Sequence, residues 1–209
     1  MRQFVVGMST ESNASIVKIT SQILKNLSSV AIFARAAKVR PFQFEDNMIW
    51  KDIDTFSSWL EENREDSRVF STCGGFDPIH VGHVRCLRDT AEMKTSNDLF
   101  VVIANGDGFL KAKKGYVFMP EPERMEVLHS IKGVDHVVLW YDGTQNCIGA
   151  IEKIKPNVFT KGGDRSSRSR IPEADMCDQV GCEIVFGVGG TDKPQSSSWL
   201  IEKAQKSSE

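Results

Sequence analysis

The chain has 209 residues, of which 40% are hydrophobic and 26% are charged, as is typical of a globular protein. This composition excludes a wholly disordered, collagen-like or low-complexity chain. The 26 Lys and Arg residues are balanced by 28 Asp and Glu, giving a net charge of −2, so the sequence lacks the basic excess typical of nucleic-acid-binding proteins.

The sequence also carries few signs of a membrane or secreted protein. No apolar run approaches the roughly 18 residues that span a bilayer, and the first residues lack the apolar core of a signal peptide. The five cysteines include no pair at C-x-x-C spacing, which argues against a disulfide framework or a zinc knuckle. These features predict a cytoplasmic protein with no nucleic acid and no membrane as a partner.

The first 66 residues are predicted to form an N-terminal extension of unknown role. Two strands and an intervening helix are expected there, at 4–8, 30–34 and 14–27. Residues 54–65 predict a short amphipathic helix that is capped by Asp54. Because a polar, linker-like stretch follows this helix, we place the domain boundary at residue 66, before a second domain over 67–209.

From residue 67 onward, apolar strands alternate with amphipathic helices. The expected strands are 69–72, 98–104, 134–139, 157–160 and 183–186. The expected helices are 83–93, 121–131, 145–154 and the last dozen residues from Ser196. Several strands are apolar on both faces, which is typical of a parallel sheet between helices. The sequence thus predicts an α/β fold, a Rossmann-like open parallel five-stranded sheet with helices on both faces, plus a small N-terminal α/β extension.

The segment 73–83, CGGFDPIHVGH, follows the first of these strands and opens a helix. In open parallel sheets, ligands bind outside the carboxyl ends of the strands. Gly74 and Gly75 let the backbone approach a ligand closely, and His80 and His83 share one face of the first helical turn. Together with the free N–H groups of the helix start, the imidazoles predict a phosphate site. Two structural histidines or half of a zinc site are the alternatives.

The string G-x-F-D-x-x-H-x-G-H in this segment resembles the signature of the cytidylyltransferase-like nucleotidyltransferases. The resemblance implies that His80 and His83 are catalytic and stabilise the pentacovalent transition state at the α-phosphate of a nucleoside triphosphate. The other residues implied to bind the nucleotide here are Gly74, Gly75, Phe76, Asp77 and Gly82. Asp77 is also a candidate metal ligand, and a structural role in the turn is the equal alternative.

Residues 101–115 resemble the second strand of this family, followed by its N-S-D element and a lysine loop, with Gly106 where Ser is usual. The resemblance implies that Lys111 is a catalytic residue that reaches the triphosphate, with Lys114 as the next nucleotide-binding lysine. Asn105 and Asp107 are the implied substrate-binding residues. For any single lysine, a solvated basic loop is the alternative.

Two further segments carry nucleotide-binding candidates. Residues 123–128 resemble the family's E-R-x-x-x-L helix, in which Arg124 either anchors the loop to the sheet or touches phosphate. The K-G-G-D sequence at 161–164 resembles that of bacterial heptose 1-phosphate adenylyltransferases. Here Gly162 and Gly163 would let the backbone face the base or ribose of the nucleotide, and Lys161 would add charge nearby. Asp164 would accept a hydrogen bond from a sugar hydroxyl, with a structural cap as the alternative.

The serines before the final helix complete the set of candidates. They stand where the family has x-S-T-T, and their hydroxyl groups are expected to cap the helix and to bind phosphate. These residues are Ser196, Ser197 and Ser198.

The resemblance covers about residues 67–205 and implies a nucleotidyltransferase. It would transfer a nucleoside monophosphate from an NTP, foremost ATP, to a phosphorylated small molecule, foremost a heptose-like sugar 1-phosphate, and release pyrophosphate. The alternatives are a CTP-dependent cytidylyltransferase acting on a polyol or amino-alcohol phosphate, or a non-catalytic nucleotide-binding regulatory module. Mg²⁺ or another divalent cation is the expected cofactor, and a homodimer is the assembly that the resemblance implies.

Overall fold

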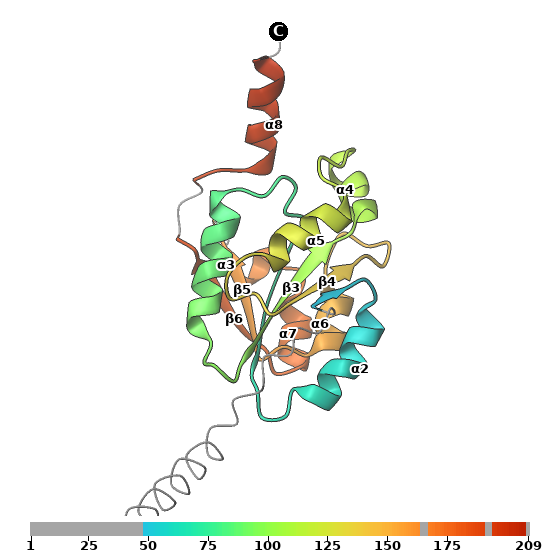
Figure 1. The fold of residues 1–209 in the computed structure, drawn as a ribbon, viewed down its shortest axis with the longest axis vertical. Coiled ribbons are helices and arrows are strands. Elements are labelled where there is room, and N and C mark those ends of the chain that lie inside the picture. The colour runs from blue at the N-terminus through green and yellow to red at the C-terminus, as the bar shows by residue number, and fades with distance from the viewer. Residues whose placement is uncertain (1–47, 164–166, 191–193, 208–209) are drawn as a thin grey trace, which may run out of the picture. The chain divides into compact units, whose positions relative to one another are not determined.

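The computed structural model describes residues 48–163, 167–190 and 194–207 (Figure 1). The predicted elements at 4–8, 14–27 and 30–34 lie outside the described residues, as does Asp164. Within the chain, residues 46–209 form one compact unit, which carries the whole of the described structure.

A parallel six-stranded sheet with the strand order β1-β4-β3-β2-β5-β6 forms the centre of this unit. The strands are β1 (Ile49–Trp50), β2 (Val69–Gly74), β3 (Leu99–Asn105), β4 (His136–Trp140), β5 (Val158–Gly162) and β6 (Glu183–Val188). Every pair of neighbours is parallel. The α/β fold and the five predicted strands are therefore confirmed, and β1 adds a sixth strand at one edge.

Helices follow most strands along the chain. They are α2 (Ile53–Asn63), α3 (Val81–Met93), α4 (Asp107–Lys114), α5 (Glu121–His129), α6 (Ile148–Ile154), α7 (Ala174–Gln179) and α8 (Ser197–Lys206), with a 3-10 turn at Arg168–Arg170. Both α4 and α7 are additions to the prediction, because helices this short show little periodicity in a sequence. The cap of α2 also differs: Asp52, not Asp54, accepts the N–H of Thr55 at 2.7 Å.

The two faces of the sheet carry separate hydrophobic clusters, because successive strand residues point to opposite sides. Val101 and Ile103 of β3 lie in a cluster with residues of α2, α6 and α7. Phe100 and Val102 lie in the other cluster, with residues of α3 and α5 (Figure 1). Burial on both faces is the physical reason why the strands are apolar throughout.

β1 and α2 belong to this sheet, although the sequence places them in the N-terminal extension. β1 pairs with β4, and the indole of Trp50 donates a hydrogen bond to His136 Nδ1 at 3.2 Å. The helix α2 buries one face in the core, through Ile53, Phe56 and Leu60. The compact unit accordingly begins at Asp46, and residue 66 falls inside it because the apolar face of α2 needs the sheet to cover it.

The direction in which strands are added reverses at β2. From β2 the chain builds β3 and β4 on one side, and then returns to build β5 and β6 on the other. The loops that follow β2 and β5 therefore diverge at the carboxyl edge of the sheet, where open α/β folds bind their ligands. Among the described residues, no helix has both the length and the apolar character needed to cross a membrane.

Candidate active site

A cavity of about 940 Å³ lies at this edge of the sheet, lined by the ends of β2 and β5 and by parts of α3, α4 and α8. It collects most of the predicted site residues: Gly74, Gly75, Phe76, His80, Gly82, His83, Asn105, Lys114, Lys161, Gly162, Gly163, Ser196, Ser197 and Ser198. Four predicted residues, Asp77, Asp107, Lys111 and Arg124, are described but lie outside its lining. The predicted segments therefore converge on one cavity, except at these four residues.

The two histidines form a stacked pair at the start of α3. Their ring centroids are 3.7 Å apart with 20° between the planes, and His80 is the N-cap residue of the helix. Phe76 contacts His83 edge-on, with 5.0 Å between the ring centroids. Among the described residues, the buried Nδ1 of His83 has no hydrogen-bond partner. This packing fixes the orientation of both imidazoles at the cavity.

Burial, with smaller contributions from His80 and Lys114, lowers the pKa of His83 to about 3. The His83 imidazole is therefore neutral at physiological pH and donates a single N–H. An anion bound in the cavity would oppose this shift, because a nearby negative charge favours the protonated imidazole.

Two glycines of the predicted site leave little room for a side chain. A Cβ at Gly82 would lie 3.2 Å from two atoms of the His80 ring. A Cβ at Gly162 would lie 2.9 Å from Cys86 Sγ and 3.0 Å from the backbone carbonyl oxygen of Val188. A side chain at Gly82 or Gly162 would therefore crowd α3 and β6, whereas the close approach of Gly74 and Gly75 to a ligand stays a prediction.

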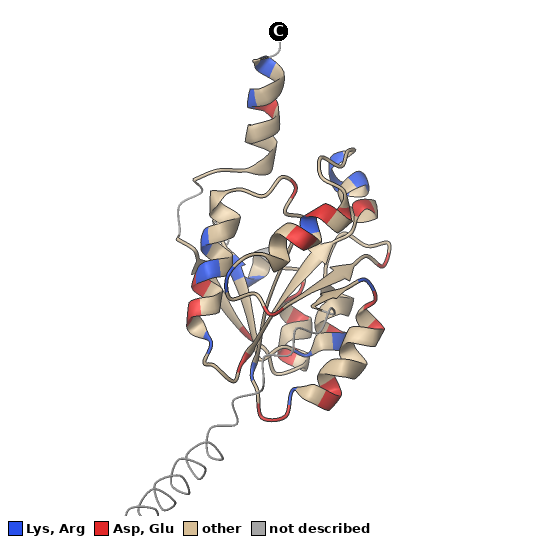
Figure 2. Ribbon diagram, in the orientation of Figure 1, with Lys and Arg blue, Asp and Glu red and all other residues tan. Residues whose placement is uncertain are grey.

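The lysines belong to a helix and not to a loop. α4 ends in three lysines and is closed by Gly115 in the left-handed conformation (Figure 2). Lys113 and Lys114 line the cavity, and Lys114 Nζ donates to the carbonyl of Asp77 at 2.8 Å. Burial lowers the pKa of Lys114.

Lys111, predicted as a catalytic residue, is exposed and lies outside the cavity lining. Residues two apart differ by about 200° around a helix, so Lys111 and Lys113 lie on nearly opposite faces of α4. We therefore assign to Lys113 the place at the cavity that the sequence analysis predicted for Lys111.

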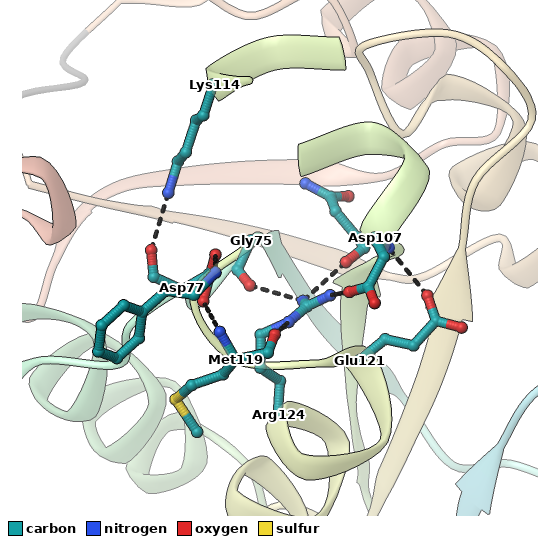
Figure 3. Close-up of polar contacts among 9 residues, drawn as sticks. Gly75, Asp77, Asp107, Lys114, Met119, Glu121 and Arg124 are labelled. Atoms are coloured by element: carbon teal, nitrogen blue, oxygen red, sulfur yellow. Dashed lines mark hydrogen bonds and ion pairs between the residues drawn. The ribbon is translucent and has the colours of Figure 1, made fainter. Parts of the chain in front are cut away.

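Arg124 is an anchor between loops. Its buried guanidinium donates to the carbonyl oxygens of Gly75 at 2.7 Å, Asn105 at 2.7 Å and Met119 at 2.9 Å (Figure 3). It also pairs with Asp107 Oδ1 at 2.8 Å. Of the two roles open for Arg124, this geometry favours anchoring over phosphate contact, and it commits Asp107 to the same anchor.

Asp77 holds the neighbouring loop. Its carboxylate is fully buried and accepts the backbone N–H groups of Phe118 at 2.9 Å and Met119 at 2.7 Å (Figure 3). Because each oxygen accepts one of these amides, the geometry favours the structural role in the turn over that of a metal ligand. A metal site at Asp77 does not fit this arrangement.

Asn105 remains a candidate for contact with a substrate. Its side chain is 5% exposed, and its Oδ1 meets no hydrogen-bond donor within the described part of the chain. A buried amide oxygen without a partner is costly, so a donor from a bound ligand would stabilise it. Asn105 and Asp107, predicted together, thus differ in the role that the fold allows.

The end of β5 brings a third lysine to the cavity. Lys161 is 3% exposed, with Nζ 3.4 Å from Glu173 Oε2 and 4.4 Å from the Phe159 ring centroid. Gly163 follows with φ +69°, a backbone conformation that favours glycine and turns the chain away from the strand.

The three serines surround the start of α8. Ser196 caps the helix, accepting the N–H of Trp199 at 3.3 Å, and its hydroxyl lies 3.0 Å from that of Ser198. Ser197 donates to the carbonyl of Pro78 at 2.9 Å. The predicted capping role is thus found at Ser196, and Ser197 ties the helix start to the loop that carries the histidines.

Besides Lys113, the sequence analysis missed a cluster of three residues in the cavity lining: Cys73, Cys147 and Glu173. Cys147 Sγ lies 2.7 Å from Cys73 Sγ and 3.2 Å from Glu173 Oε1. A signal existed for Cys73, which directly precedes the glycine pair at the carboxyl end of β2. For Glu173 no local pattern marks the position, because a loop far along the chain brings it here.

Comparison with known proteins places the chain among nucleotidyltransferases. Residues 71–176 match the family described as cytidylyltransferase-like. The chain is 31% identical over 163 residues to the "Bifunctional protein HldE" of Geotalea uraniireducens and 38% identical over 138 residues to that of Alcanivorax borkumensis. These matches cover 76% and 64% of the chain but 31% and 26% of the relatives. The chain thus spans less than a third of the length of these relatives.

A solved structure shares the fold. The pantoate-beta-alanine ligase of Francisella tularensis, complexed with beta-gamma ATP and beta-alanine, superimposes with a TM-score of 0.51. The match covers 77% of each chain at 15% sequence identity, and it shows a common Rossmann-like architecture alone.

Proposed function

The chain belongs to the cytidylyltransferase-like family of nucleotidyltransferases, and from this membership we propose that it transfers a nucleotidyl group from an NTP to a phosphorylated small molecule. We propose ATP as the donor and a heptose-like sugar 1-phosphate as the acceptor, because residues 161–164 resemble the K-G-G-D of heptose 1-phosphate adenylyltransferases. The observation that carries the proposal is the stacked pair of His80 and His83 at the cavity.

The proposed reaction is an in-line displacement at the α-phosphorus. A phosphate oxygen of the acceptor forms the new P–O bond, while the bond from the α-phosphorus to the bridging oxygen breaks and pyrophosphate leaves. The acceptor oxygen is already anionic at neutral pH, so no general base is needed. Positioning and charge stabilisation therefore provide most of the catalysis.

The residues at the cavity suit these two tasks. The N–H groups of His80 and His83 would donate to the α-phosphate oxygens, where negative charge grows in the transition state. Lys113 and Lys114 would meet the β- and γ-phosphates, which become pyrophosphate. The N-terminus of α8 provides further N–H groups with a partial positive charge for the same anion.

Mg²⁺, or another divalent cation, is proposed as a cofactor that enters with the triphosphate. Such an ion keeps several water ligands and needs few from the protein. Asp77 is not proposed as a ligand, since its oxygens accept two backbone amides. We expect EDTA to abolish pyrophosphate release and added Mg²⁺ to restore it; full activity in EDTA would contradict the proposal.

Substrate identity is tested with the purified full chain. ATP and CTP are each paired with a sugar 1-phosphate, glycerol 3-phosphate and a phosphorylated amino alcohol, and pyrophosphate release is measured. We expect the fastest release with ATP and the sugar 1-phosphate. Release with CTP and a polyol phosphate would move the chain to the cytidylyltransferase alternative. No release with any pair would contradict the enzymatic function.

The histidine roles are tested by His80→Ala and His83→Ala. Each change removes a donor to the developing charge, so kcat should fall by about 10²-fold or more while circular dichroism stays unchanged. His129→Ala is the matched control, because His129 lies on α5 outside the cavity lining and should keep its kcat. An unchanged kcat in both cavity variants would refute the assigned roles.

A further inference from the structure

Two cysteines meet at the cavity without a role in nucleotidyl transfer. Cys73 comes from the end of β2, and Cys147 is the N-cap residue of α6, 74 positions later in the chain. Both line the cavity, and the thiol of Cys73 is the less buried of the two. The fold therefore brings two thiols together in the lining of the cavity.

The distance between the two sulfur atoms is 2.7 Å. A disulfide bond is about 2.05 Å long, so a small movement of one side chain would bring the sulfurs to bonding distance. The geometry is that of a dithiol pair poised for reversible bonding.

Two charged residues prepare the pair for reaction. Lys161 Nζ lies 3.4 Å from Cys73 Sγ, and Glu173 Oε1 lies 3.2 Å from Cys147 Sγ. The hydrogen bond from Cys147, together with Lys161, lowers the pKa of Cys73 to about 7. Burial raises the pKa of Cys147. One thiol is thus a thiolate near neutral pH, as oxidation-sensitive cysteines are, and the other keeps its proton beside an acceptor.

We propose that Cys73 and Cys147 are a site of reversible oxidation, in which a peroxide oxidises Cys73 and Cys147 resolves the product to a disulfide. The Cys73 thiolate attacks a peroxide oxygen: an S–O bond forms, the O–O bond breaks, and the leaving hydroxide takes up a proton as water. Cys147 then attacks the Cys73 sulfur, the S–S bond forms, and the hydroxyl leaves as water with the Cys147 proton, which passes through Glu173. Two thiols and one peroxide thus yield a disulfide and two waters, and a dithiol reductant reverses the change.

A metal ion is the competing occupant of this cluster. The Cys73, Cys147 and Glu173 ligand atoms all lie within 4.8 Å of one another. However, two thiolates on one tetrahedral zinc ion stand about 3.8 Å apart, given Zn–S bonds of about 2.3 Å. The Lys161 ammonium, 3.4 Å from both Cys73 Sγ and Glu173 Oε2, would also repel a cation. The geometry therefore favours oxidation.

The test treats the full reduced chain with hydrogen peroxide and analyses its peptides by mass spectrometry without reduction. We expect one linked peptide pair that joins Cys73 to Cys147, with the loss of two hydrogens, about 2 Da, and its disappearance in dithiothreitol. In Cys147→Ser, Cys73 should stop at the sulfenic acid and be labelled by dimedone. In Cys73→Ser, both the link and the label should be lost.

Cys86→Ala is the matched control. Cys86 also lines the cavity, but burial raises the pKa of its thiol, so the link between Cys73 and Cys147 should form at the unchanged rate. Peroxide that modifies Cys86 while Cys73 and Cys147 stay reduced would overturn the proposal. Stoichiometric Zn²⁺ binding that protects both thiols and is lost in Cys73→Ser would overturn it too, by assigning the cluster to a metal.

Discussion

The guanidinium of Arg124 contacts three segments at once, through the carbonyl oxygens of Gly75, Asn105 and Met119. These segments follow β2, end β3 and precede α5, so a single side chain holds the carboxyl edge of the sheet together. A buried guanidinium whose donors are used in this way is a positioning group, and its removal leaves Asp107 without its partner.

Arg124→Met should lower the free energy of unfolding by about 3–5 kcal/mol, because it removes a buried guanidinium from its ion pair and leaves three carbonyl groups without its hydrogen bonds. Denaturant titration measures the change. Arg88→Met is the control, since Arg88 is exposed and its ion pairs among the described residues are with neighbours on its own helix; its stability should match the parent chain. Native stability in Arg124→Met, with weaker nucleotide binding, would show that Arg124 contacts phosphate.

His136 is the second residue whose burial has a measurable consequence. Burial lowers its pKa to about 4, and its ring contacts Trp59 edge-on with 4.6 Å between the centroids. The folded chain therefore resists protonation of a group that the unfolded chain protonates near pH 6.5. Stability is then fully present above pH 6.5 and is lost as the pH falls toward 4.

Between pH 6.5 and 4, His136 should reduce the free energy of unfolding by at most about 1.4 kcal/mol per pH unit. His136→Gln should flatten the slope, and urea titrations at several pH values measure it. His83 acts in the same direction, so some slope remains in this variant. An equal slope in the variant and the parent would contradict the assignment.

At the scale of elements, the rotation of α4 about its axis decides which of its lysines line the cavity. Phe109 and Leu110 bury one side of the helix, and the lysines at its C-terminus match the negative end of the helix dipole. Once Phe109 and Leu110 fix the rotation of the helix, Lys113 and Lys111 must face different surroundings.

We expect Lys113→Ala to raise the KM for the nucleoside triphosphate by about tenfold, the value of one hydrogen bond to a charged group. Lys111→Ala is the matched control, with the same charge change on the same helix, and should alter KM little. Steady-state kinetics with ATP measures both. A larger effect of Lys111→Ala would restore the catalytic role that the sequence predicted for it.

At the scale of the whole molecule, the sheet includes more of the chain than the family resemblance covers. β1 adds an edge strand beside β4, and α2 covers the face where Trp50, Phe56 and Leu60 are buried. The core of the transferase domain therefore depends on residues before the predicted boundary at 66.

Truncated chains distinguish a domain that begins at Asp46 from one that begins at residue 67. A chain that begins at Asp46 should keep cooperative thermal unfolding, while one that begins at residue 67 should be unfolded or aggregated. The shorter chain loses several large core side chains, each worth about 2–5 kcal/mol, against a total stability of about 5–15 kcal/mol. Circular dichroism and size-exclusion chromatography measure the outcome. A folded chain from residue 67 would support the original boundary, and the elution volume of the full chain tests the predicted homodimer.

Local patterns in the sequence by themselves predicted most of the sheet, the place of the candidate site and one helix cap. The alternation of apolar runs with helical spacing predicted the five strands from β2 to β6 and the parallel sheet, because burial on both faces leaves a mark in each strand. The glycine–histidine string predicted a candidate site at the end of β2, because its glycines and histidines lie close together in the sequence and line the same cavity. The cap at Ser196 was predictable for the same local reason.

The tertiary structure decided whatever depends on contacts between distant segments. It assigned Arg124 to the loops and the cavity contact to Lys113, because both outcomes depend on how α4 and α5 pack on the sheet. It placed the thiol of Cys73 beside that of Cys147, which lies 74 positions later in the chain, and brought Lys161 and Glu173 next to them. Sequence periodicity records which side of an element is buried, whereas the partners that meet there are selected by the packing of the whole chain.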